Sequence, residues 1–127
     1  MAMITMNKRQ TILVIGSSGQ LGRSIQSIRV DYPDYEIVFT SRQQLDLTKD
    51  ISIADFFEHN TFNIIINCAA YTAVDKAESE PELANQINHL AAQKLAIIAK
   101  KHNSKLIHIS TDYVFSGIQH RPYIETD

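Results

Sequence analysis

Residues 11–22, TILVIGSSGQLG, decide the fold of this chain. The run TILVI is apolar and rich in β-branched side chains, which is typical of a strand buried on both faces of a parallel sheet. After the glycines, Leu21, Ile25 and Ile28 recur at i, i+4 and i+7, which predicts one apolar stripe on a helix of about three turns. A strand, a glycine-rich turn and a helix in this order predict the start of a Rossmann-like unit.

The rest of the chain alternates short apolar runs with helical periodicity. Further strands are predicted over residues 36–40, 63–68 and 106–109. Helices are expected to begin at Asp50, as a cap, and at Pro81, and QLDL at residues 44–47 is a candidate short edge strand. Strands separated by helices pair in parallel through right-handed crossovers. We therefore expect an α/β, Rossmann-like doubly wound parallel sheet of order 3-2-1-4-5 that ends before the later strands.

Composition limits what the protein can do. A chain of 127 residues with 44% hydrophobic and 20% charged residues has room for one globular domain, here residues 11–127 after a flexible N-terminus over residues 1–10. The net charge of -2 argues against a nucleic-acid partner. One cysteine, Cys68, cannot build a disulfide framework. Neither a signal peptide nor a membrane span is apparent, so we expect a cytoplasmic protein without membrane contacts.

The glycines at residues 16, 19 and 22 have separate expected roles. Gly16 allows a sharp turn, Gly19 lets a pyrophosphate approach the backbone, and Gly22 lets the helix press against the sheet. The helix N-terminus then offers free N–H groups and a partial positive charge to the anion. The spacing G-x-x-G-x-x-G resembles the turn of short-chain dehydrogenases/reductases. The alternative is a tight strand-to-helix connection without a ligand.

The segment after the second predicted strand bears on cofactor choice. An acid normally binds the ribose 2′-hydroxyl of NAD there, but this chain has Thr40-Ser41-Arg42. Without a repelling carboxylate, and with Arg42 able to bind a 2′-phosphate, NADPH should be accepted. The alternative for Arg42 is a solvated surface charge. Asp46 is expected to accept a hydrogen bond from the adenine amino group, or else to form a local turn or helix cap.

Three later segments carry a family resemblance. They are NCAAYTAVDKAE at residues 67–78, STDYVF at residues 110–115 and PYIETD at residues 122–127. From Thr11 onward the chain resembles the dTDP-4-dehydrorhamnose reductases of the extended short-chain dehydrogenase/reductase superfamily. That family reduces the 4-keto group of dTDP-6-deoxy-L-lyxo-4-hexulose with NADPH or NADH to give dTDP-L-rhamnose, a precursor of cell-surface polysaccharide.

The resemblance also implies a site. Thr111 matches the residue that hydrogen-bonds the sugar carbonyl, and Asp112 and Tyr113 lie beside the nucleotide-sugar substrate. A hydroxyl suits that role because it can donate to an oxygen on which negative charge develops. The small side chains of Ala69 and Ala70 leave room for the cofactor. The implied cofactor contacts are Gly19, Gln20 and Leu21 at the pyrophosphate, Asp46 and Leu47 at the adenine, and Ala70, Tyr71 and Thr72 at the ribose and nicotinamide.

The chain departs from the family pattern where proton transfer is concerned. No tyrosine is followed by a lysine four residues later, although this superfamily uses a Y-x-x-x-K pair for that step. We therefore expect an incomplete nucleotide-binding domain without its C-terminal substrate domain, which binds cofactor weakly and turns over negligibly. We also expect a bare sheet face and a bare edge at residues 105–110, through which the chain could form a homodimer or otherwise self-associate.

Other interpretations stay open. A nucleotide-sugar dehydratase or epimerase is disfavoured by Tyr113, because dehydratases usually carry an acid after Thr-Asp. A non-catalytic, NADP-binding regulatory subunit resembling that of methionine adenosyltransferase shares similar motifs. No metal is predicted, because the histidines lack ligand spacing and Ser24 replaces a glutamate that some relatives use in a metal-assisted dimer.

Overall fold

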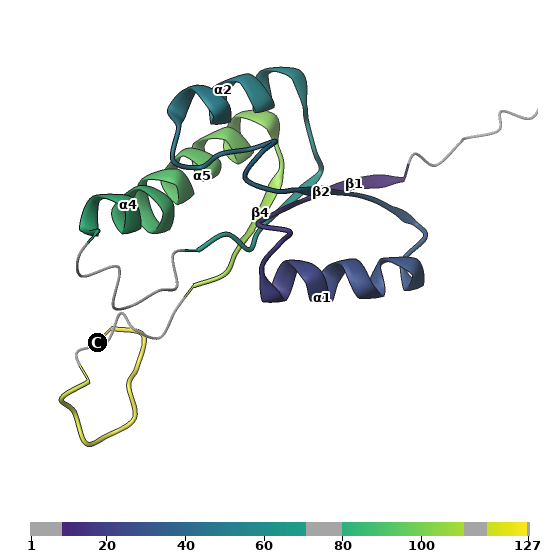
Figure 1. Ribbon diagram of the computed structural model, residues 1–127. Helices are drawn as coiled ribbons and strands as arrows, with labels where there is room; N and C mark the ends of the chain where they lie inside the picture. The colour runs from purple at the N-terminus through teal and green to yellow at the C-terminus, as the bar shows by residue number, and fades with distance from the viewer. Residues whose placement is uncertain (1–8, 71–79, 111–116, 127) are drawn as a thin grey trace, which may run out of the picture.

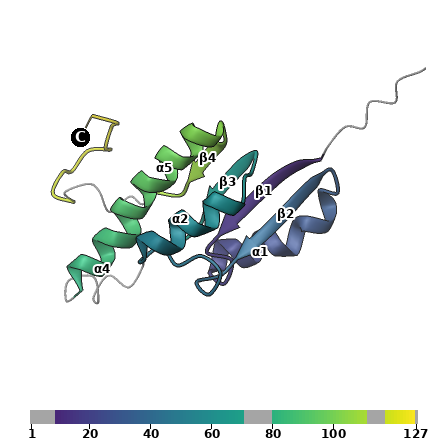
Figure 2. The ribbon, with the colours of Figure 1, turned by 90° about the horizontal axis from the view of Figure 1, so that it is seen from above.

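The computed structural model describes residues 9–70, 80–110 and 117–126. Within these ranges one parallel sheet has the strand order β2-β1-β3-β4, which Figure 2 shows from above. The prediction of a Rossmann-like parallel sheet with the first strand at its centre is confirmed. The strands are β1 (Gln10–Ile15), β2 (Tyr35–Thr40), β3 (Ile64–Asn67) and β4 (Lys105–His108).

The helices form two layers around the sheet. Figure 1 shows α1 (Gln20–Ile28) on one face and α2, α4 and α5 on the other. This division follows from the topology, because the chain leaves β1 in one direction through α1 and crosses back through α2 to the other side of β1. The remaining bounds are η1 (Arg29–Asp31), α2 (Asp50–His59), α4 (Pro81–Asn85), the π-helical η2 (Gln86–Leu90) and α5 (Ala91–His102).

The segment at residues 44–47 is not a strand, so the expected edge strand is wrong. Its backbone is held by local hydrogen bonds, because the N–H groups of Gln44 and Leu45 both donate to the Ser41 carbonyl at 3.1 Å. The Asp46 carboxylate makes a further local bond to the Thr48 N–H, at 2.9 Å. Local side-chain hydrogen bonds of this kind compete with sheet pairing. The two leucines of the segment are nevertheless buried in the core.

The start of α2 also differs from the expectation. Lys49 occupies the cap position, without a side-chain cap, and Asp50 is the first helical residue. The Asp50 carboxylate forms an ion pair with Lys94 of α5 instead of capping its own helix. An acid in the first turn still stabilises the helix through its dipole.

The main core lies between the sheet and the α2/α5 layer. Leu13 and Ile65 occupy neighbouring positions of the sheet and are fully buried. Burying such a side chain contributes about 1.5–3 kcal/mol each. The helical side of this core is formed by Leu45, Leu47, Ile53, Phe57, Phe62, Ala91, Leu95 and Ala99.

The opposite face of the sheet is covered unevenly. Val14, Ile66 and Ile107 are paired across β1, β3 and β4. Val14 is 0% exposed and Ile107 is 49% exposed, so burial is lost toward β4. The expected stripe on α1 is also only partly buried, with Ile28 at 45% exposure. Among the described residues, α1 thus leaves the β4 side of this face partly exposed, in the direction of the expected bare face. None of the described helices is long and apolar enough to span a bilayer.

The turn from β1 to α1 is packed backbone against backbone. Gly16 has φ +78°, and a Cβ there would lie 2.7 Å from the Ala69 nitrogen and 2.8 Å from its Cα. A Cβ on Gly22 would lie 2.7 Å from the Ser17 Cα. All three distances are shorter than a van der Waals contact. The predicted role of Gly16 in turning is therefore confirmed, and Gly22 allows close packing of α1 against the turn at Ser17, where the expectation was packing against the sheet.

Gly16→Ala should lower the free energy of unfolding by more than about 2 kcal/mol, because it adds left-handed strain to an overlap with backbone atoms. Gly117→Ala is the matched control, since Gly117 has φ +75° but no neighbouring atom within 4 Å of a Cβ. Urea unfolding of both variants measures the difference. If both variants lost the same free energy of unfolding, the contact between Gly16 and Ala69 would not contribute to stability.

Candidate functional site

A cavity of about 230 Å³ opens at the carboxyl ends of β1 and β3. In open α/β sheets, ligands bind at this edge and at the point where strand order reverses, which here is between β1 and β3. The cavity is lined by Ile15, Gly16, Ser18, Gly19, Arg42, Leu45, Asp46, Leu47, Thr48, Cys68, Ala69, Ala70 and Ile87.

A larger hollow lies elsewhere, between α2 and α5, with a volume of about 690 Å³. Its apolar lining includes Phe57 and Ile98, and charged groups such as Lys101 stand beside them. It lies away from the carboxyl ends of the strands and from the glycine turn. Its size therefore does not make it the better candidate for a nucleotide.

Gly19 lines the first cavity and is the cap residue of α1. Its φ of -77° and ψ of 177° are open to any residue, and a Cβ would meet only the Gly16 carbonyl oxygen, at an ordinary 3.5 Å. The fold therefore requires Gly16 and Gly22 but does not require Gly19. A ligand that approaches the backbone explains the third glycine better than a tight connection does.

The amino end of α1 is suited to an anion. The first N–H groups of a helix have no partner within the helix and carry a partial positive charge. The first turn of α1 contains no acidic side chain that would neutralise it. A phosphate placed at Ser18 and Gly19 would meet these groups without a competing carboxylate from the turn.

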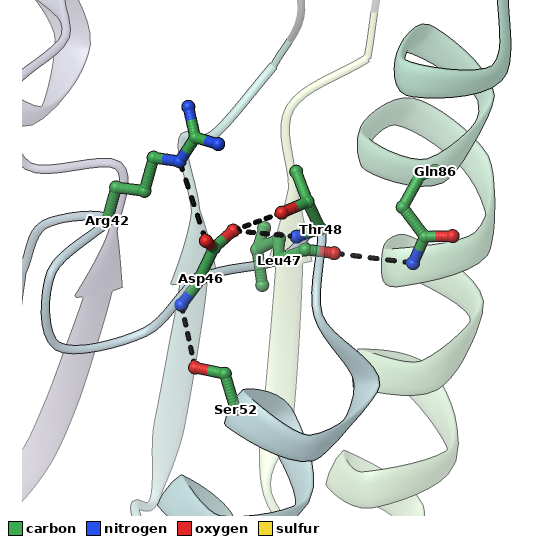
Figure 3. A network of polar contacts seen from close by, with 6 residues as sticks. All are labelled: Arg42, Asp46, Leu47, Thr48, Ser52 and Gln86. Atoms are coloured by element: carbon green, nitrogen blue, oxygen red, sulfur yellow. Dashed lines mark hydrogen bonds and ion pairs between the residues drawn. The ribbon is translucent and has the colours of Figure 1, made fainter.

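Asp46 is the centre of a polar network beside the cavity, drawn in Figure 3. Its Oδ1 accepts hydrogen bonds from the Thr48 N–H at 2.9 Å and from the Thr48 hydroxyl at 2.6 Å. Its Oδ2 lies 3.5 Å from Nε of Arg42, and its own N–H donates to Oγ of Ser52 at 2.9 Å. The Thr48 hydroxyl bond is the main cause that lowers the pKa of Asp46 below its usual range. The carboxylate is therefore ionised at neutral pH.

The local turn predicted for Asp46 is confirmed. The side chain forms the local turn with Thr48, and it also lines the cavity. Arg42 lines the cavity as well, although 75% of its side chain is exposed, so it is both a rim residue and a solvated charge.

Cys68, Ala69 and Ala70, which follow β3, line the cavity as well, and Asn67 at the end of β3 supports them. Asn67 is 1% exposed, its Oδ1 accepts the Ala69 N–H at 3.1 Å, and its Nδ2 lies 3.2 Å from Nδ1 of His108. Asn67 therefore ties the loop to the sheet. Burial raises the pKa of the Cys68 thiol, which suits a small packing residue and not a nucleophile.

Comparison with known proteins identifies the family. The model of the RmlD substrate binding domain matches residues 10–127. The chain belongs to this family. The match covers every described strand and the whole cavity.

Relatives in this family are dTDP-4-dehydrorhamnose reductases. The enzyme of Aggregatibacter actinomycetemcomitans is 46% identical over 119 residues, and that of Escherichia coli (strain K12) is 39% identical over 120 residues. In both cases the alignment covers 91% of this chain and 40% of the relative. The chain thus spans about two fifths of the length of these relatives.

Solved structures of the same family share the fold. The dTDP-4-dehydrorhamnose reductase of Clostridium acetobutylicum superposes with a TM-score of 0.83 at 41% identity, covering 92% of this chain and 41% of that one. The Bacillus anthracis enzyme, in complex with NADP, gives a TM-score of 0.80 at 36% identity, covering 88% of this chain and 40% of that one.

Within this family fold, the structure brings together part of the predicted site. Of the predicted cofactor residues, the cavity is lined by Gly16, Gly19, Arg42, Asp46, Leu47, Ala69 and Ala70. Thr40 is 3% exposed, its hydroxyl donates to the Val14 carbonyl at 3.3 Å, and it does not line the cavity. Gln20, Leu21 and Gly22 belong to the first turn of α1 and also lie outside the lining. The predicted residues Tyr71, Thr72, Thr111, Asp112 and Tyr113 fall outside the described residues.

Sequence reasoning missed several lining residues. Thr48 follows Asp46 by two positions, and an Asp with a Thr at that spacing is a signal for a local turn. Ile87 also lines the cavity, and it lies in η2. No periodicity in the sequence indicated that η2 is π-helical. Within the described ranges, no group of three or more His, Cys, Asp or Glu side chains is placed to hold a metal ion.

Proposed function

We propose that this chain is the dinucleotide-binding part of a dTDP-4-dehydrorhamnose reductase. The whole enzyme would reduce the 4-keto group of dTDP-6-deoxy-L-lyxo-4-hexulose to dTDP-L-rhamnose with NADPH or NADH as hydride donor. The observation that carries the proposal is Gly19, a glycine that the fold does not need, in the lining of a cavity beside the amino end of α1. The family match and the names of the relatives support it.

Residues of the cavity lining and of the segments next to it would each contact a different part of the cofactor. The pyrophosphate would lie against Gly19 and the N–H groups of Gln20 and Leu21. The adenine would lie beside Asp46 and Leu47. The nicotinamide and its ribose would pass Ala69, Ala70, Tyr71 and Thr72, where the two alanines leave room. Thr40 would support this site from within the sheet.

The substrate side of the proposal rests on the family resemblance. Thr111 would donate its hydroxyl hydrogen bond to the sugar carbonyl, and Asp112 and Tyr113 would contact the nucleotide sugar. The sequence contains no Y-x-x-x-K pair to supply the proton. Loss of general acid catalysis costs about 10²–10⁴-fold in rate, so this chain alone should bind cofactor and show negligible turnover.

Gly19→Ala should weaken NADPH binding by at least about tenfold, because its methyl group would stand where the pyrophosphate meets the backbone. The free energy of unfolding should stay within about 0.5 kcal/mol of the parent chain, since the methyl meets no overlap. Isothermal titration calorimetry and urea unfolding measure the two quantities. Ser27→Ala, at the far end of α1, is the control.

Two results would contradict this assignment. One is a parent chain that is folded but binds neither NADPH nor NADH. The other is Gly19→Ala binding as tightly as the parent chain, which would place the dinucleotide elsewhere.

We also infer that the chain self-associates through the bare sheet face. Ile107 and Ile109 are 49% and 44% exposed beside the edge of β4. Exposed apolar groups next to an unpaired strand edge favour association with another chain.

Ile107→Lys should therefore shift the chain toward the monomer in sedimentation velocity at concentrations where the parent forms dimers. Ile97→Lys is the matched control, because Ile97 is 61% exposed on α5, on the other side of the sheet. A monomeric parent chain, or an equal effect of both substitutions, would refute association through this face.

A further inference from the structure

The guanidinium group of Arg42 is bound along one side only. Its Nε lies 3.5 Å from Oδ2 of Asp46, and in Figure 3 no dashed line joins either terminal nitrogen to the residues drawn. In the part of the chain that the structure describes, Asp46 provides the one ion pair of this arginine. The terminal edge, which can bind a phosphate in a bidentate manner, is left open at the rim of the cavity.

Asp46 is much better fixed than the arginine it binds. Thr48 holds its Oδ1 by two hydrogen bonds, at 2.9 Å and 2.6 Å. Its backbone N–H donates to Ser52, and its carbonyl accepts the Lys49 N–H at 3.1 Å. The side chain is 16% exposed, against 75% for Arg42. A well-fixed carboxylate thus binds a largely exposed arginine.

The neighbouring backbone adds to this rigidity. Nε2 of Gln86 donates to the Leu47 carbonyl at 3.4 Å, which links the segment to the π-helical η2. The Gln44 side chain accepts the Ser41 N–H at 2.8 Å and closes the loop that carries Arg42. Asp46 is therefore a fixed point against which a long side chain can be oriented.

We propose that Asp46 is a positioning residue that orients Arg42 toward the 2′-phosphate of NADPH, so that discrimination between NADPH and NADH depends on this carboxylate. The inference rests on the proposed function and adds a specificity determinant to it. An arginine already held through Nε loses less side-chain freedom when its terminal edge binds a phosphate. NADH lacks the 2′-phosphate and gains nothing from that orientation.

Charge repulsion alone predicts the opposite effect of Asp46 on NADPH binding. A carboxylate near a phosphate dianion repels it, so removing the charge of Asp46 would strengthen NADPH binding. The ion pair with Arg42 offsets this repulsion, because the negative charge is already compensated at 3.5 Å. The two accounts therefore predict opposite changes in cofactor preference after one substitution.

Asp46→Asn tests the proposal on this chain. The measured quantity is the ratio of the dissociation constants of NADH and NADPH, from isothermal titration calorimetry at low salt. Asparagine can keep the hydrogen bonds to Thr48 but loses the charge that holds Arg42. The ratio should fall by about fivefold to tenfold, whereas losing an adenine contact would weaken both cofactors alike and leave the ratio unchanged. Asp34→Asn, exposed before β2, is the control and should leave the ratio unchanged.

A double-mutant cycle assigns the effect to the pair. Arg42→Ala should bring the ratio close to one, and Asp46→Asn should have no further effect on the ratio in that background. Arg42→Lys keeps the positive charge but lacks both the Nε donor and the planar fork, so it should also lose most of the preference. Because Arg42 is largely exposed, this variant tests the proposal even if Asp46→Asn does not fold.

The outcomes separate this proposal from the proposed function. A folded parent chain that binds neither cofactor overturns both. A parent chain that binds both cofactors equally, an Asp46→Asn ratio that is unchanged or raised, or a full preference in Arg42→Lys overturns only the positioning role.

Discussion

The backbone of Gly16 packs directly against the backbone of residues 68 and 69, and much of the structure depends on this contact. A Cβ at Gly16 would overlap Ala69, so the end of β1 can approach the end of β3 only without a side chain. The same turn brings Gly22 against Ser17 and fixes the direction of α1. As a result, the amino end of a helix, the carboxyl ends of two strands and the loop after β3 border one small cavity.

The lining of the cavity combines small or apolar side chains with one pair of opposite charges. The uncharged part includes Ile15, Ala69 and Ala70. The charged part is Arg42 and Asp46, whose charges compensate each other. The uncharged part suits a close approach of phosphate to the backbone, and the charged pair suits discrimination at the ribose. The two parts come from different segments, and they meet because β2 pairs with β1.

The sequence predicted the architecture because the strands and the glycine turn have strong local signals. TILVI and NIIINC form strands as expected, and the turn follows the first of them. The segment at residues 44–47 has a strand-like pattern, but local hydrogen bonds to the Ser41 carbonyl and to the Asp46 carboxylate override it. The stripe on α1 has helical periodicity, but periodicity does not show how much of a sheet one helix can cover.

The candidate site was predictable where its residues belong to a motif with a strong local signal. The motif assigned Gly16 and Gly22 to turning and packing. Only the backbone geometry showed that the fold does not require a glycine at position 19. The sequence offered two roles for Asp46, and only the structure showed that a local turn and a position at the cavity are compatible. Ile87 reaches the cavity from a π-helical segment, which has no sequence signal of its own.

The central claim is that a dinucleotide lies with its phosphates at the amino end of α1. An NMR titration of the isotopically labelled chain with NADPH tests it most directly. The account predicts that the largest amide shift changes fall on Ser18, Gly19 and Gln20, with little change at Ile97 and Lys101 beside the hollow between α2 and α5. Shift changes confined to that hollow, or none at the glycine turn at saturating NADPH, would contradict it.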